Sequence, residues 1–121
     1  MAGWLDDVAR SIQRLREEGS QRIWLVGSTT GGSLAIMAAA HDPEIRGVAA
    51  MAPRADFDDW AAHPRRFLQH CRDVGVVDND GYPDSVNQWA DELRQHRTID
   101  SIKLIGERPL LIIHGTNDRQ V

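Results

Sequence analysis

The sequence lacks the features that mark several large classes of protein. Its 121 residues include one cysteine, Cys71, which excludes an internal disulfide. No apolar run approaches the roughly 18 residues of a membrane-spanning helix, and the acidic N-terminus lacks the apolar core of a signal peptide. The net charge is −4 and the cations are scattered, unlike the basic stripe of a nucleic-acid binder. These absences predict a soluble, cytoplasmic protein with neither a membrane nor a nucleic-acid partner.

What the sequence does contain is an alternation of short apolar strands and helical patterns. Hydrophobic residues make up 41% of the chain, which is enough for the core of one domain. Apolar runs predict buried strands at 22–26, 47–52 and 109–115, and helices are expected at about 4–18 and 31–41. This order predicts the α/β class, with a parallel sheet of three visible strands and helices on both faces in three layers.

Residues 53–108 differ in composition from the rest of the chain. Two amphipathic helices are expected there, one ending near Gly75 and one following Pro83. Their apolar faces carry Phe67, Cys71 and Val74 in the first and Val86, Trp89 and Leu93 in the second. Aromatic residues in this segment could line an apolar pocket, but the interpretation we favour is that they bury the two helices against each other.

The stretch VGSTTGGS, residues 26–33, lies between a predicted strand and a predicted helix. A phosphate-binding loop would need four residues between its glycines and a following lysine, and a dinucleotide fingerprint would need G-x-G-x-x-G. Neither pattern fits. The nucleophile elbow G-x-S-x-G does fit in spacing, with Gly27 and Gly31 in register and both expected to be packed tightly. A glycine-rich turn without chemistry is the alternative that this stretch alone leaves open.

A second stretch, RPLLIIHGTNDRQV at 108–121, supports the elbow. Together the two stretches resemble the α/β-hydrolase superfamily, in particular its esterase and serine-aminopeptidase-like members, in which an HG-x-x-D-x-x-V pattern follows a late strand. The nucleophile-then-acid order is also that of the family. The resemblance covers nearly the whole chain as the central-to-late part of the fold. It implies one partial hydrolase domain over 1–121, with 57–100 as a helical cap-like insertion.

The resemblance assigns roles to three residues. Thr29 stands at the nucleophile position, the N–H of Thr30 would be one oxyanion donor, and Asp118 stands at the acid position. His114 belongs to the HG of the strand end, which is not the base in the family. The implied substrate is a small acyl compound (an ester, amide or thioester), and neither a cofactor nor a metal is implied.

The sequence also departs from the family pattern. The family's base histidine follows the acid beyond a further strand, whereas this sequence ends three residues after Asp118. The early strands, with the second oxyanion donor, are missing too. A β-branched threonine would be strained at the positive φ of an elbow. We therefore expect a triad hydrolase as the parent activity but an inactive chain by itself. The alternatives are a non-catalytic binding domain and an unrelated fold with a chance elbow.

Two further expectations follow from the missing parts. The remaining histidines, His41, His63, His70 and His96, lie outside the family's base position and are expected at the surface or at helix ends. The strand at 22–26 should form an exposed edge of the sheet, which predicts a homodimer or poor solubility. The alternative is that the first helix covers this edge.

Overall fold

The computed structural model describes residues 1–118, which form two compact units. The sheet unit comprises Met1–Ala55 together with the residues from Arg97 onward, and the helical unit comprises Asp56–His96. Val121, the last residue of the HG-x-x-D-x-x-V pattern, lies outside the described residues. Each unit is described on its own below.

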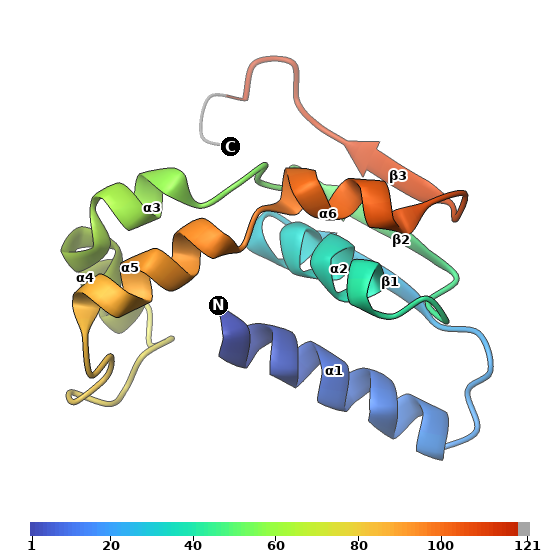
Figure 1. Ribbon diagram of the computed structural model, residues 1–121, viewed down its shortest axis with the longest axis horizontal. Helices are drawn as coiled ribbons and strands as arrows, with labels where there is room; N and C mark the ends of the chain where they lie inside the picture. Colours follow the sequence, from blue (N-terminus) through green and yellow to red (C-terminus); the bar gives the residue numbers. More distant parts are fainter. Residues whose placement is uncertain (119–121) are drawn as a thin grey trace. The chain divides into compact units, whose positions relative to one another are not determined.

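The sheet unit contains three parallel strands, β1 (Trp24–Ser28), β2 (Gly47–Met51) and β3 (Leu110–Ile113), in the order β1-β2-β3 (Figure 1). Leu25, Val48 and Leu110 lie side by side in the register, and the N–H of Val48 donates to the carbonyl of Pro109 at 2.9 Å. The predicted parallel sheet and the α/β class are confirmed. β1 is an edge strand of this sheet, as expected, and β3 lies two places away from it.

Three helices pack with this sheet: α1 (Ala2–Glu17), α2 (Thr30–His41) and α6 (Thr98–Ile105). The α1 helix ends at Glu17, and the φ of 92° at Gly19, two residues later, allows the N–H groups of Gly19 and Ser20 to bond the carbonyls of Arg16 and Leu15 in the last turn. The α2 sequence is apolar all round, and seven of its residues are buried. It ends at His41, because the following residue, Asp42, precedes Pro43, which disfavours helix at the residue before it.

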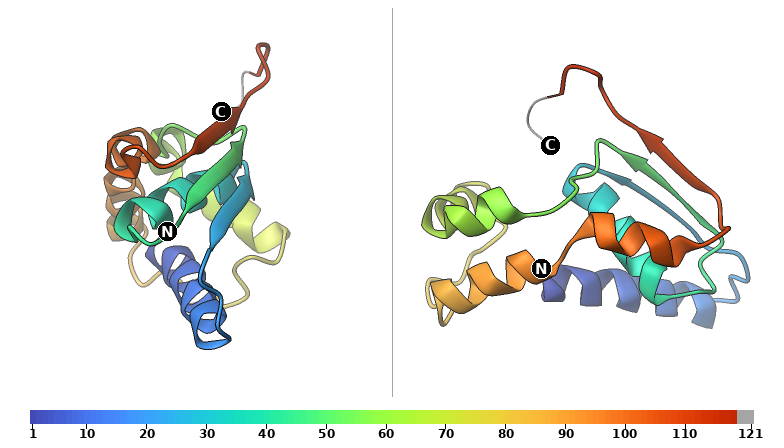
Figure 2. Two further views of the ribbon diagram at one scale, coloured as in Figure 1. Left: turned by 90° about the vertical axis from the view of Figure 1, so that its right-hand side faces the viewer. Right: turned by 45° about the horizontal axis from the view of Figure 1, so that its top comes forward.

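The helices of the sheet unit lie on one face of the sheet (Figure 2, left). Ile12 of α1, Ile36 of α2 and Ile105 of α6 share one core with Val48 of β2. The opposite face is apolar but open, since Trp24 is 55% exposed, Val26 70% and Leu111 55%. The expectation of helices on both faces is therefore wrong for the described part of this unit, which has two layers. Strands that are apolar on both sides do not reveal which side is covered.

The α6 helix was not predicted: its first three residues lie in the segment 57–100 expected to form the insertion, and no helix was expected between that segment and the last strand. Its Ile105 is buried in the sheet core. Arg108 follows it and donates to the carbonyls of Asp42 and Ile45, at 2.9 and 3.2 Å, which ties α6 to the connection between α2 and β2. Residues 97–100, expected in the insertion, thus belong to the sheet unit.

The helical unit consists of α3 (Asp58–Ala62), α4 (Pro64–Asp73) and α5 (Val86–Gln95). The last two are the predicted amphipathic helices, and α3 was missed. Their aromatic rings pack on one another: Trp60 stacks on Phe67 at 3.9 Å between ring centroids, and Phe67 stacks on Trp89 at 5.3 Å. Val74 is exposed, contrary to its expected place on the apolar face. This stack supports the interpretation that the aromatics bury the helices of their own unit.

Candidate functional site

The predicted elbow is the turn between β1 and α2. Thr29 lies between the strand and the helix with φ 50° and ψ −121°, so the expected positive φ is present. Its N–H donates to the carbonyl of Met51 at 2.8 Å, and its own carbonyl accepts from Gly32 and Ser33 at 3.0 and 3.2 Å. These three bonds hold Thr29 at the apex of the turn, where the residue is exposed at the carboxyl end of the sheet.

Glycine is required at one position of this turn, and a second glycine, not the expected one, is tightly packed. A Cβ at Gly27 would lie 2.1 Å from the carbonyl oxygen of Gly31, so the strand and the helix touch there. A Cβ at Gly32 would lie 3.2 Å from the oxygen of Gly27 and 3.4 Å from Pro53. A Cβ at Gly31 would meet nothing within 4 Å. The expectation that Gly31 must be small is wrong, because this residue makes the contact through its carbonyl group and a Cβ on it would point into open space.

A second strained residue lies beside the elbow, where β2 ends. Ala52 has φ 46°, and its N–H donates to the carbonyl of Ile113 at 2.7 Å. Ser33, fully buried in α2, exchanges two hydrogen bonds with the backbone of Arg54: its Oγ accepts from the N–H at 2.9 Å and donates to the carbonyl at 3.1 Å. Ser33 thereby fixes the segment after β2 against the first turn of α2. Strained non-glycine residues of this kind concentrate at functional sites.

Thr30 is the first residue of α2. The N–H groups of a first helical turn have no intrahelical acceptor, and the helix dipole makes that end electropositive. An oxyanion that forms on the Oγ1 side of Thr29 would therefore find the N–H of Thr30 nearby. Thr29 and Thr30 are adjacent in the chain, at the junction of the turn and α2.

Asp118 lies in the loop after β3, where its carboxylate faces an unexpected partner. Its Oδ2 lies 3.6 Å from Nε2 of His114, with the two side chains 24% and 33% exposed. The loop turns back on itself through a bond of 3.1 Å from the N–H of Asp118 to the carbonyl of Gly115. Sequence reasoning set His114 aside. His114 and Asp118 are the first and last residues of HGTND, and this spacing of four was the sequence signal for their contact.

The elbow and the pair lie at the same end of the sheet, with β2 between them. Thr29 is bonded to Met51, and the neighbouring Ala52 is bonded to Ile113, the residue before His114. Since adjacent strands lie about 4.8 Å apart, the ends of β1 and β3 are separated by roughly 10 Å. Thr29 and Thr30 thus lie at the carboxyl end of the sheet, and Asp118 lies in the loop that leaves β3 at that end.

The other histidines have local roles. The Nδ1 atoms of His41, His63 and His96 lie 2.8, 3.3 and 2.7 Å from the carbonyl four residues earlier in their own helices. His70 is exposed on α4. Their expected place at the surface or at helix ends is confirmed. Cys71 is buried, and burial raises the pKa of its thiol, so it packs in the core without being a reactive thiolate.

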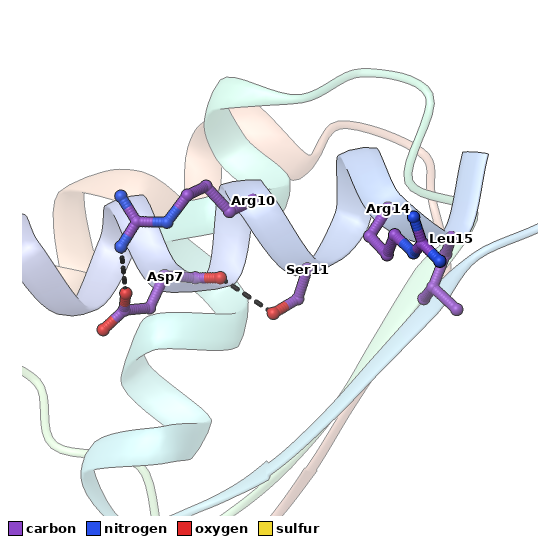
Figure 3. Close-up of a pocket in the computed structure, with 5 residues that line it drawn as sticks. All are labelled: Asp7, Arg10, Ser11, Arg14 and Leu15. Atoms are coloured by element: carbon purple, nitrogen blue, oxygen red, sulfur yellow. Dashed lines mark hydrogen bonds and ion pairs between the residues drawn. The ribbon is translucent and has the colours of Figure 1, made fainter. Parts of the chain in front are cut away.

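Two hollows lie along α1. One is a groove of about 370 Å³ between α1, the free edge of β1 and the start of α2, whose lining includes Ile12, Leu25 and Val26. The other is an open hollow on α1 (Figure 3), where Arg10 pairs with Asp7, and Ser11 donates to the carbonyl of Asp7 at 2.8 Å. The polar groups of the second hollow bind one another, so it offers no site.

Within residues 1–118, no three metal-ligating side chains are grouped to hold a metal ion. None of the helices in that range is long and apolar enough to cross a membrane. In comparisons with known proteins, no protein-family model matches the chain, and no curated protein matches it significantly.

Proposed function

We propose that the turn at 27–31 is a nucleophile elbow of the α/β-hydrolase type and that the chain carries part of an acyl-transfer site. The observation that carries this proposal is the backbone of Thr29, with φ 50° and ψ −121° directly between the strand β1 and the buried helix α2. The contact of Gly27 with the first turn of α2 supports it, because this contact gives the turn its sharpness. The substrate class is an ester, amide or thioester.

In this proposal each residue of the turn has a separate task. The Thr29 hydroxyl attacks the substrate carbonyl, and the N–H of Thr30 stabilises the oxyanion that forms. A strained β-branched residue costs on the order of 1–3 kcal/mol at such a φ, and its methyl group crowds the approach to Oγ1. The threonine also favours a second candidate, a domain that keeps the elbow but binds its acyl ligand without turnover.

The test uses a nucleophile that needs no neighbouring base. Thr29→Cys and Ser28→Cys are made in a Cys71→Ser background, so that each chain has one cysteine. Acylation by p-nitrophenyl acetate is followed by intact-protein mass. We expect the cysteine at 29 to react at least about tenfold faster than the one at 28, because a helix N-terminus lowers a thiol pKa and supplies the oxyanion donor. Equal rates would refute the elbow.

We propose in addition that the free edge of β1 pairs with a second copy of the chain. The strand is an edge strand, and α1 leaves a groove beside it without covering it. Trp24 and Val26 add exposed apolar surface next to that edge. An open edge of this kind pairs with another strand unless it is protected. For the helical unit, the cap role stays a prediction.

A further inference from the structure

We infer that the groove beside β1 holds the alkyl chain of the acyl group that the elbow receives, so that the substrate is a medium-chain acyl compound; this inference rests on the proposed function. The groove has a volume of about 370 Å³ and lies between α1, β1 and the start of α2. Both glycines of the elbow motif, Gly27 and Gly31, line it. Each of them is two residues from Thr29 in the chain, so its Cα lies within about 7 Å of the Thr29 Cα. One end of the groove is therefore next to the proposed nucleophile position.

Gly31 leaves this end of the groove open. A Cβ on Gly31 would meet no atom within 4 Å, whereas a Cβ on Gly27 would lie 2.1 Å from the carbonyl oxygen of Gly31. Gly31 thus makes its contact with the strand through its backbone, and the space where a side chain would lie is free. A chain attached to an acyl carbon at residue 29 can enter the groove through this space.

The lining of the groove suits a hydrocarbon chain. Its apolar residues come from three elements: Val8, Ile12 and Leu15 of α1, Leu25 and Val26 of β1, and Leu34 of α2. The side chains of Asp7 and Ser11 also line it, and both already have partners on α1, Asp7 in Arg10 and Ser11 in the carbonyl of Asp7. Small-molecule sites have this character, with an apolar lining and few polar groups. The groove therefore favours an alkyl chain over a polar acyl group.

The length of the groove determines the length of the chain. Its lining on the strand side runs from Ile23 to Gly27, which is about 13 Å at roughly 3.3 Å per residue. An extended alkyl chain advances by roughly 1.25 Å per carbon, since its bonds of about 1.5 Å meet at tetrahedral angles. About eight to ten carbons therefore fill the groove. Full burial of one methylene favours binding by about fourfold, and about twofold is expected in a groove that is open on one side.

The test extends the two cysteine variants to a longer ester. Thr29→Cys and Ser28→Cys, each in the Cys71→Ser background, are acylated by p-nitrophenyl acetate and by p-nitrophenyl octanoate, and intact mass gives the rates. The thiol loses its proton to the buffer, its sulfur bonds to the acyl carbon, and p-nitrophenolate leaves. We expect the octanoate-to-acetate rate ratio to be about 50-fold higher at position 29 than at position 28, from about twofold for each added methylene. Equal ratios at the two positions would overturn the inference.

Two further substitutions locate the chain on the protein. Leu15 is 43% exposed, so Leu15→Glu places a charge in the groove at little cost to the core, and it should lower the ratio at position 29 at least about tenfold. The matched control is Leu111→Glu on the open face of the sheet, where Leu111 is 55% exposed. It should change the ratio less than twofold. The reverse result would overturn the inference, because the chain would then lie on the open face.

Binding of octanoate gives a readout that does not depend on acylation. We expect sodium octanoate to shift the methyl resonances of Val8, Leu15 and Leu34 in the ¹³C-labelled wild-type chain, and those of Leu111 much less. This measurement decides the matter if Leu15→Glu fails to fold, and shifts confined to methyl groups outside the groove would overturn the inference.

The elbow and the groove can fail separately. If the cysteine at position 29 reacts faster than the one at position 28 with acetate, but octanoate adds no preference, only the groove is refuted and the elbow stands. If position 29 has no advantage with either ester, the elbow is refuted and the inference falls with it.

Discussion

The contact between β1 and α2 at Gly27 predicts that an added methyl group there lowers the stability of the fold by a large amount. In Gly27→Ala the new Cβ would lie 2.1 Å from the oxygen of Gly31, 2.3 Å from its carbonyl carbon and 2.6 Å from the nitrogen of Gly32. All three are backbone atoms, so no side chain can turn aside. Reaching the 3.4 Å of ordinary contact needs a displacement of 1.3 Å between strand and helix.

The magnitude follows from the packing of the core. Overpacking a close-packed interior costs typically about 1–3 kcal/mol when side chains can adjust, and here the backbone must move. We therefore expect Gly27→Ala to lose at least about 3 kcal/mol, a large part of the 5–15 kcal/mol of a typical domain. The matched control is Gly31→Ala, where a Cβ meets nothing within 4 Å. In a helix this change gains roughly 0.5–1 kcal/mol.

Urea denaturation followed by circular dichroism measures the difference. A gap of about 4 kcal/mol between the two variants corresponds to roughly 2–3 M in the unfolding midpoint for a slope near 1.5 kcal/mol/M. If Gly27→Ala lies within about 1 kcal/mol of Gly31→Ala, the strand and the helix do not touch at this point. The close packing of the turn would then be refuted.

Three further predictions concern other parts of the sheet unit. Thr29→Gly should raise the free energy of unfolding by about 1 kcal/mol because it relieves a positive φ, whereas Thr30→Gly in α2 should lower it; thermal denaturation distinguishes the two. The hydrogen bond from Arg16 holds the pKa of the Asp42 carboxyl below its ordinary 3.8. The stabilisation by this pair is present above pH 3.8 and is lost as the pH falls through the lower pKa of Asp42 in the folded state. Asp42→Asn should therefore lower the free energy of unfolding at pH 7. It should also weaken the fall of the urea midpoint at acid pH. Val26→Lys, at the free edge of β1, should convert a dimer into a monomer in sedimentation velocity, and a wild-type monomer at tens of micromolar would contradict the edge pairing.

The sequence predicts the sheet well because its signals are local. The apolar runs at β1, β2 and β3, and the glycines around Thr29, each determine their own short stretch of backbone. The sequence could not predict which face of the sheet the helices cover, because the exposed Trp24 and Val26 are as apolar as the residues that are buried. Only the packing of α2 and α6 distinguishes the two faces. The α6 helix was missed for a similar reason: its stability comes from contacts with α2.

The candidate site was predictable in part. The spacing of Gly27 and Thr29 indicates the elbow and its positive φ, because few combinations of φ and ψ allow a strand to turn so sharply into a helix. Which of the neighbouring glycines is packed depends on the direction of each Cα–Cβ bond, which the sequence does not encode directly. The contact of His114 with Asp118 depends on how the loop after β3 turns, and only the structure reveals it.

The backbone of Thr29 in solution is the most direct test of the central claim that this turn is an elbow. Nuclear magnetic resonance of the ¹⁵N,¹³C-labelled chain gives φ at this residue from the HN–Hα coupling together with residual dipolar couplings. We expect a positive φ near the 50° of the structure, with neighbouring Thr30 at an ordinary helical angle. A negative φ at Thr29, in the helical or extended region, would contradict the elbow and with it the proposed acyl chemistry.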